Sequence, residues 1–121
     1  MELNKDSVRL SLDEDTYSII KFTTATIPLK ITNLSKNIIP STITSKNQTY
    51  LSYHIYENDK MVVPDGKRTR FEVDLLPGKE YVQGLSIDLP QKRGKYIIEI
   101  DLLTENKHWW GINKRCCLII T

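Results

Sequence analysis

Apolar side chains along this chain recur at every second residue, not at every third or fourth. The alternation is clearest in four stretches, at residues 27–31, 51–56, 85–89 and 96–103. Successive side chains of a β-strand point to opposite faces of the sheet, so this period predicts half-buried strands. The β-branched and apolar run at residues 115–121 predicts a buried closing strand. Weaker patterns favour further strands near residues 7–12, 17–22, 61–63 and 70–75.

Turn-forming residues separate these runs. Pro64-Asp65-Gly66 and Pro77-Gly78 combine a residue that presets φ with one that accepts a positive φ. Residues 35–49 have the weakest pattern and predict a long connection with one short strand at most. No stretch has the apolar stripe of an amphipathic helix. About seven to nine short strands in this arrangement predict an all-β fold, an antiparallel immunoglobulin-like β-sandwich. A small barrel is the alternative.

Length and charge limit the choices further. The chain has 121 residues, 40% of them hydrophobic, and a formal net charge of +2. This predicts one β-sandwich domain over residues 1–121. The net charge is too small to indicate nucleic acid as a partner. No apolar run has the length of a membrane-spanning helix, and the first residues lack the apolar region of a secretory signal. We therefore expect no direct membrane insertion.

Two cysteines, Cys116 and Cys117, are neighbours in the closing strand. Their side chains should point to opposite faces, which makes an ordinary disulfide between them unfavourable. Unpaired thiols are typical of a reducing compartment. No CxxC motif is present, and His54 and His108 lie far from the cysteines in the sequence. The sequence thus predicts neither a metal site nor a cofactor.

The motifs of common enzyme classes are absent. The sequence has no GxSxG, no HExxH, no phosphate-binding glycine loop and no dinucleotide fingerprint. Carboxylate pairs occur at Asp13/Asp15 and at Glu99/Asp101. Glycosidase carboxylates usually face each other across a cleft from different elements, whereas each of these pairs belongs to one turn or one strand. We expect the second pair to form a solvated strand face, and we expect no catalytic residues and no enzyme activity.

Aromatic and hydrogen-bonding side chains gather at three places in the sequence, at residues 53–56, 65–70 and 108–110. Sugars are recognised by aromatic platforms with a few well-placed polar groups, which is what these residue types can supply. If Tyr53 belongs to the core, its neighbours in the strand point outward and can meet a ligand. The candidate binding residues are His54, Tyr56, Asp65, Arg68, Asp101, Glu105, Trp109 and Trp110.

Structural roles for the same residues remain open. Adjacent tryptophans face opposite ways, so one of Trp109 and Trp110 in the core and one at the surface is the natural division. Arg68 pairs with Asp101 or with Glu105 in the structural alternative. His54 is then a hydrogen-bonded residue of the sheet.

At these residues the chain resembles a recurring β-sandwich module of bacterial surface-polysaccharide enzymes. It is similar to the accessory module of glycosyltransferases and methyltransferases, and to the C-terminal carbohydrate-binding domain of the ATPase subunit of O-antigen ABC transporters. In place of the family's usual Trp and closing Phe, this chain has Ile55 and Trp110. The resemblance covers roughly residues 25–121 and rests on Leu51-Ser-Tyr-His54, Asp65-Gly-Lys-Arg-Thr69, Leu76-Pro-Gly78, Pro90, Gly94-Lys-Tyr96, Asp101-Leu-Leu-Thr-Glu105 and Trp109-Trp110.

The resemblance implies a non-catalytic domain that recognises a surface polysaccharide for an attached or associated glycosyltransferase or transporter. It implies a cytoplasmic location at the inner face of the membrane. The alternative is a structural domain without glycan affinity that forms a homodimer or docks onto a biosynthetic enzyme. In that case an exposed edge at residues 115–121 would pair between chains.

Overall fold

The computed structural model describes residues 3–21, 23–43, 46 and 48–121. These residues form β-strands and no helix, which confirms the all-β prediction. Phe22 in the predicted strand at 17–22, and residues 44, 45 and 47 in the predicted connection, lie outside the described residues. The strands are β1 (Val8–Ser11), β2 (Thr16–Ile19), β3 (Thr24–Asn33), β4 (Thr49–Glu57), β5 (Lys60–Val63), β6 (Glu80–Asp88), β7 (Gly94–Thr104), β8 (His108–Trp109) and β9 (Lys114–Ile120).

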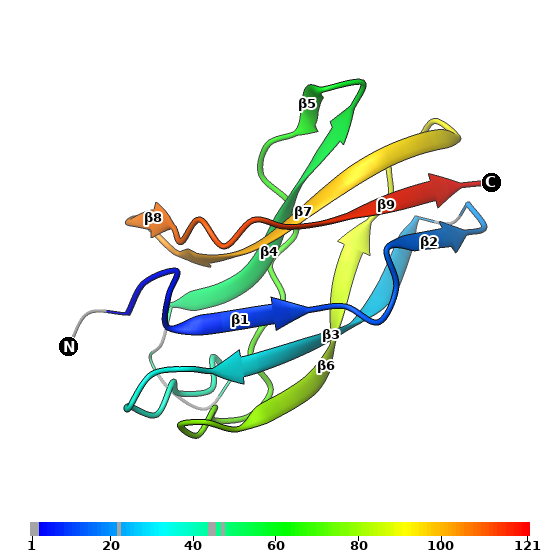
Figure 1. The fold of residues 1–121 in the computed structure, drawn as a ribbon. Coiled ribbons are helices and arrows are strands. Elements are labelled where there is room, and N and C mark those ends of the chain that lie inside the picture. The colour runs from blue at the N-terminus through cyan, green and yellow to red at the C-terminus, as the bar shows by residue number, and fades with distance from the viewer. Residues whose placement is uncertain (1–2, 22, 44–45, 47) are drawn as a thin grey trace.

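The strands form two facing sheets (Figure 1). The smaller sheet has the order β1-β3-β6, and the larger has the order β2-β9-β7-β4-β5, with β8 paired to the end of β7. Two facing sheets of this kind make a β-sandwich. One pair departs from the antiparallel expectation, because β2 runs parallel to β9. The chain moves from the smaller to the larger sheet between β1 and β2 without reversing direction, as Figure 1 shows.

The core lies between the inner faces of the two sheets. On β4, Leu51, Tyr53 and Ile55 are at most 1% exposed, as the alternation predicted. Inward residues of β7, β9, β3 and β6 supply most of the rest of the core: Tyr96, Ile98, Ile100, Leu102, Cys116, Leu118, Ile120, Ile27, Leu29, Ile31, Leu85 and Ile87. The face of the larger sheet that points away from this core is called the outer face below.

The predicted strand at residues 70–75 is wrong. This segment crosses from the larger sheet to the smaller one, with single bridges at Leu51–Thr69 and Ile39–Leu75. Phe71 inserts into the core and is fully buried. Its amide donates to the Thr42 hydroxyl at 3.1 Å and its carbonyl accepts from the Thr42 amide, so its backbone bonds to the connection instead of to a strand ladder. The connection at 35–49 has no strand of its own before residue 49 among its described residues, only the bridge at Ile39.

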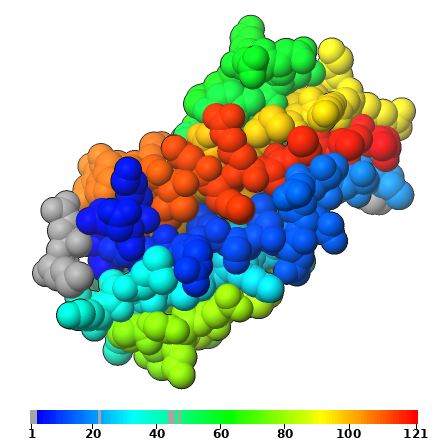
Figure 2. Space-filling model, viewed as in Figure 1, coloured from blue at the N-terminus to red at the C-terminus, as the bar shows by residue number. Residues whose placement is uncertain are grey.

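The closing strand is also not an edge. β9 lies between β2 and β7, so the expectation of an exposed edge at residues 115–121 is wrong. The two ends of the larger sheet's strand order are β2 and β5. On β5, Met61 and Val62 are each 40% exposed. The β4–β5 hairpin stands out from the body of the molecule (Figure 2).

Candidate functional site

Among the outward-facing side chains of β4 are those of Ser52, His54 and Tyr56. Because Tyr53 is buried in the core, its neighbours Ser52 and His54 face away from it, and Tyr56 follows on the same side. His54 and Tyr56 are half-buried, while Ser52 is fully buried under the segment that follows β5. The outward orientation of His54 and Tyr56 agrees with the sequence-based prediction.

The segment after β5 runs along the edge of β4 and positions the candidate residues Asp65 and Arg68. The amide of Gly66 donates to the carbonyl of Tyr53 at 3.0 Å, and Leu51 and Thr69 exchange two backbone hydrogen bonds. Gly66 must be small, since a Cβ there would lie 2.6 Å from the Tyr53 oxygen and ring. The Pro-Asp-Gly turn of the sequence therefore becomes a tight backbone contact, and this contact holds the following arginine beside the sheet.

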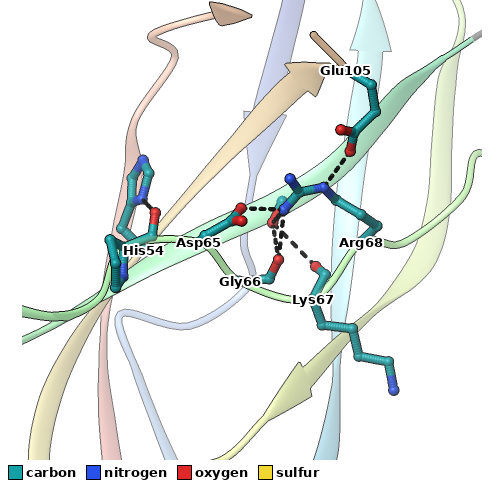
Figure 3. A network of polar contacts seen from close by, with 8 residues as sticks. His54, Asp65, Gly66, Lys67, Arg68 and Glu105 are labelled. Atoms are coloured by element: carbon teal, nitrogen blue, oxygen red, sulfur yellow. Dashed lines mark hydrogen bonds and ion pairs between the residues drawn. The ribbon is translucent and has the colours of Figure 1, made fainter.

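Arg68 bridges two carboxylates from different parts of the chain (Figure 3). Its Nε donates to Glu105 at 2.5 Å and its Nη1 to Asp65 at 2.5 Å, with a further bond from Nη1 to the Gly66 carbonyl at 2.7 Å. Ser52 lies beneath, 3.5 Å from Nη1. Partial burial works to lower the pKa of Arg68, but the hydrogen bonds to Glu105 and Asp65 outweigh it and raise that pKa. The guanidinium is thus a fixed positive charge in a defined orientation.

Two aromatic rings lie next to this ion pair. The rings of His54 and Trp109 have centroids 4.1 Å apart at an interplanar angle of 46°, and the Arg68 guanidinium lies 5.8 Å from the Trp109 ring. The Nδ1 atom of His54 is 2.6 Å from the Pro64 carbonyl, an arrangement in which Nδ1 donates. The structure therefore brings five candidate residues together. We call them the Arg68 cluster: His54, Asp65, Arg68, Glu105 and Trp109.

Tyr56 belongs to an adjoining group further along the same face. Its hydroxyl is 3.4 Å from Glu99, and the Arg115 guanidinium lies 5.0 Å from its ring. Arg115 donates from Nε to Glu99 at 2.6 Å, and this hydrogen bond raises the pKa of Arg115. Glu99 is only 6% exposed. The expectation of a solvated strand face for Glu99 and Asp101 is thus wrong.

Asp101 and Trp110 lie in the interior, where a ligand at the surface would not reach them. Asp101 is 1% exposed, and its carboxylate accepts the amides of Leu102, Gly111 and Ile112 at 2.7 to 2.9 Å. It holds the irregular backbone between β8 and β9. Trp110 packs in the core at 7% exposure and donates from its indole to the Thr104 hydroxyl. Both residues therefore have structural roles here, and we leave them out of the candidate site.

Sequence reasoning missed three contributors. Ser52 supports the network from below, as its hydroxyl donates to the carbonyls of Gly66 and Lys67. Gly66 sets the approach of the loop, and Arg115 links Tyr56 to Glu99. The tight turn was visible in the sequence. The buried serine and the pairing of Arg115 depend on strand register, which the alternation does not give.

Within the described ranges, no group of three or more His, Cys, Asp or Glu side chains could hold a metal ion. No helix in this part of the chain is long and apolar enough to cross a membrane. No protein-family model matches the chain, and no curated protein matches it.

Proposed function

We propose that this domain is a non-catalytic carbohydrate-binding module that recognises a bacterial surface polysaccharide of the O-antigen kind. It would do so for an attached or associated glycosyltransferase or ABC transporter, at the cytoplasmic face of the inner membrane. The observation that supports this most is the Arg68 cluster itself. It combines a half-exposed indole with an imidazole, an arginine fork and two carboxylates on one sheet face.

Each member of the cluster has a chemical role in this proposal. The indole of Trp109 packs against the C–H face of a sugar ring. In the described part of the chain, Arg68 uses Nε and Nη1 for its internal hydrogen bonds, which leaves the Nη2 hydrogens for a sugar hydroxyl. Asp65, whose side chain is 67% exposed, accepts hydroxyl hydrogen bonds. These groups are held in place before binding, which lowers the entropy lost on association.

The experiment is a binding screen against delipidated O-antigen polysaccharides, followed by calorimetry on the best of them. Arg68→Ala and Trp109→Ala should each weaken binding at least about tenfold, or about 1.4 kcal/mol. The matched control is Lys67→Ala, because Lys67 carries the same charge as Arg68 and its side chain points away from the network, to which only its backbone carbonyl belongs (Figure 3). Binding that survives both cluster substitutions, or no binding to any polysaccharide by the folded protein, would overturn the proposal.

A second candidate function is docking, and the exposed strand β5 favours it. Its backbone pairs with β4 on one side, and Met61 and Val62 are each 40% exposed. An exposed edge strand can add a strand from a second chain. Sedimentation analysis of the protein and of Val62→Lys tests this. A dimer that the lysine abolishes, together with no glycan affinity, would favour docking over recognition.

A further inference from the structure

A pocket of about 320 Å³ opens at the other end of the outer face from Trp109, next to the turn of the β4–β5 hairpin. It is lined by Tyr56, Asn58, Asp59, Lys95, Tyr96 and Ile97. Its volume is at the lower end of the range for small-molecule sites. The pocket includes one predicted binding residue, Tyr56, that the Arg68 cluster does not include.

The sheet geometry explains why the pocket exists. The pairing of β4 with β7 ends at Tyr56–Ile97, so Lys95 and Tyr96 extend beyond the last pair. The register between β4 and β5 shifts at Ile55/Tyr56, and a bulge of this kind bends a hairpin. The hairpin projects from the sheet in Figures 1 and 2. Space therefore opens between the hairpin turn and the first residues of β7.

The walls of the pocket are well defined. Asn58 and Asp59 have φ values of 50° and 65°, the left-handed pair of a type I′ hairpin turn. On the inner side, the hydroxyl of Tyr96 donates to the Lys92 carbonyl at 2.6 Å. The polar groups offered to a ligand are an amide, a carboxylate and an ammonium, beside the aromatic ring of Tyr56. The opposite charges of Asp59 and Lys95 suit an uncharged, hydroxylated ring better than an anion.

The pocket and the Arg68 cluster lie along one strand. His54 and Tyr56 point to the same face, and Asn58 follows β4 directly. At the rise of a β-strand, four residues from His54 to Asn58 span about 13 Å. The surface between them holds the Glu99–Arg115 pair and the Tyr56 ring, which are polar and aromatic groups. A linear glycan of a few rings could thus contact both places without leaving the sheet.

We infer that the hairpin pocket is a second subsite for the same glycan chain, and that it takes an uncharged sugar ring a few units away from the ring at Trp109. This inference rests on the proposed function. Its consequence is that affinity depends on glycan length. A fragment that reaches both subsites gains from a second contact made at high effective concentration, while a shorter fragment occupies the Arg68 cluster alone.

The test uses size-fractionated fragments of the O-antigen polysaccharide that binds best, titrated by calorimetry. Long fragments should bind at least about tenfold tighter than fragments of one or two rings. The double substitution Asp59→Gly with Lys95→Ala should remove that difference and leave the short-fragment affinity unchanged. Asn-Gly is the preferred sequence of a type I′ turn, so Asp59→Gly keeps the hairpin. Lys5→Ala combined with Asp6→Ala, at two exposed residues near the N-terminus, is the matched control, because it also removes one positive and one negative charge.

The outcomes separate the two proposals. Short fragments that bind, with no gain from length or no effect of the double substitution, would overturn the second subsite and leave the Arg68 cluster as a binding site. Absence of binding by fragments of every length would overturn the proposed function and the second subsite together. Amide shifts at Asn58 and Asp59 that appear only with long fragments would support the second subsite directly.

Discussion

His54 and Trp109 lie with their ring centroids 4.1 Å apart although their strands do not pair with each other. β4 and β8 are on opposite sides of β7, since Leu103 of β7 pairs with Tyr50 of one and with Trp109 of the other. The Trp109 side chain therefore reaches across the outer face of β7 to meet His54. As a result, the Trp109 ring lies beside the imidazole of His54 and the guanidinium of Arg68 on one sheet face.

The two adjacent tryptophans should respond to substitution in opposite ways. Trp110 is 7% exposed in the core, so Trp110→Ala should lower the free energy of unfolding by about 3–5 kcal/mol. Trp109 lies half-buried on the outer face, so Trp109→Ala should cost less than about 2 kcal/mol and affect binding instead. Urea denaturation measures both. Equal stability losses would show that Trp109 is a core residue as well.

Gly66 should tolerate no side chain. A Cβ would lie 2.6 Å from the Tyr53 carbonyl oxygen, which is backbone of a central strand and cannot move away easily. Gly66→Ala should lower the free energy of unfolding by about 1–3 kcal/mol and displace the segment that positions Arg68. Lys67→Ala is the control on the next residue. A Gly66→Ala protein with wild-type stability would contradict the close packing of this segment on β4.

Asp101 should be important for stability, and Asp65 should not. The Asp101 carboxylate accepts three backbone amides, two of them in the turn before β9. Asp101→Asn keeps the shape but replaces an acceptor by an N–H₂ donor that faces those amides, which should cost about 1–3 kcal/mol in unfolding free energy. Asp65→Asn, at an exposed side chain, should change it by less than about 0.5 kcal/mol. Thermal unfolding of the two variants side by side makes the comparison.

The buried thiol of Cys116 should make the free energy of unfolding fall at alkaline pH. Burial raises the pKa of its thiol from 9.0 to about 11, because the thiolate is poorly solvated in the core. A group whose pKa is raised by folding stabilises the native state fully below its unfolded pKa, and this contribution is lost as pH rises through the folded value. Stability should therefore fall between about pH 9 and 11, by on the order of 2–3 kcal/mol at most.

Substitution of each of the two neighbouring cysteines in turn isolates the contribution of the Cys116 thiol to this pH dependence. Burial also raises the pKa values of Tyr53 and Tyr96. These two groups therefore also lower the stability at alkaline pH, and they do so in the wild type and in both cysteine variants. Cys116→Ala should therefore have a shallower decline than the wild type over this range. Cys117→Ala should have a decline nearer to that of the wild type, because it leaves Cys116 buried and removes only the smaller electrostatic effect of Cys117 on the Cys116 pKa. Urea midpoints measured at several pH values give the slopes. Identical slopes for wild type and Cys116→Ala would rule out titration of a buried Cys116.

The strands that the sequence predicted well are those with a local signal. Alternation depends only on neighbouring residues, so β3, β4 and β7 could be recognised from it. Strand β8 is too short to alternate. Residues 70–75 alternate like a strand, but Phe71 is buried because the segment crosses between the two sheets and not because it pairs within one of them. The parallel pairing of β2 with β9 follows from a change of sheet that no local pattern records.

The candidate site was predictable in its residue types but not in its geometry. The sequence does not determine whether Arg68 pairs with Asp101 or with Glu105, and only the fold decides between these two partners. Asp101 is already engaged by the amides of Gly111 and Ile112, so Glu105 is the partner. The division of the two tryptophans between core and surface followed from strand alternation alone, and the structure agrees with it.

The most direct test of glycan recognition at the Arg68 cluster is an NMR titration with delipidated O-antigen polysaccharide, followed at the two indole N–H signals. The Trp110 indole is bonded to Thr104 in the interior and serves as the internal control. Saturable shifts of the Trp109 signal, with the Trp110 signal unchanged and the effect lost in Arg68→Ala, are the predicted result. A folded protein in which neither indole shifts, or in which Arg68→Ala responds like the wild type, would contradict recognition at this cluster.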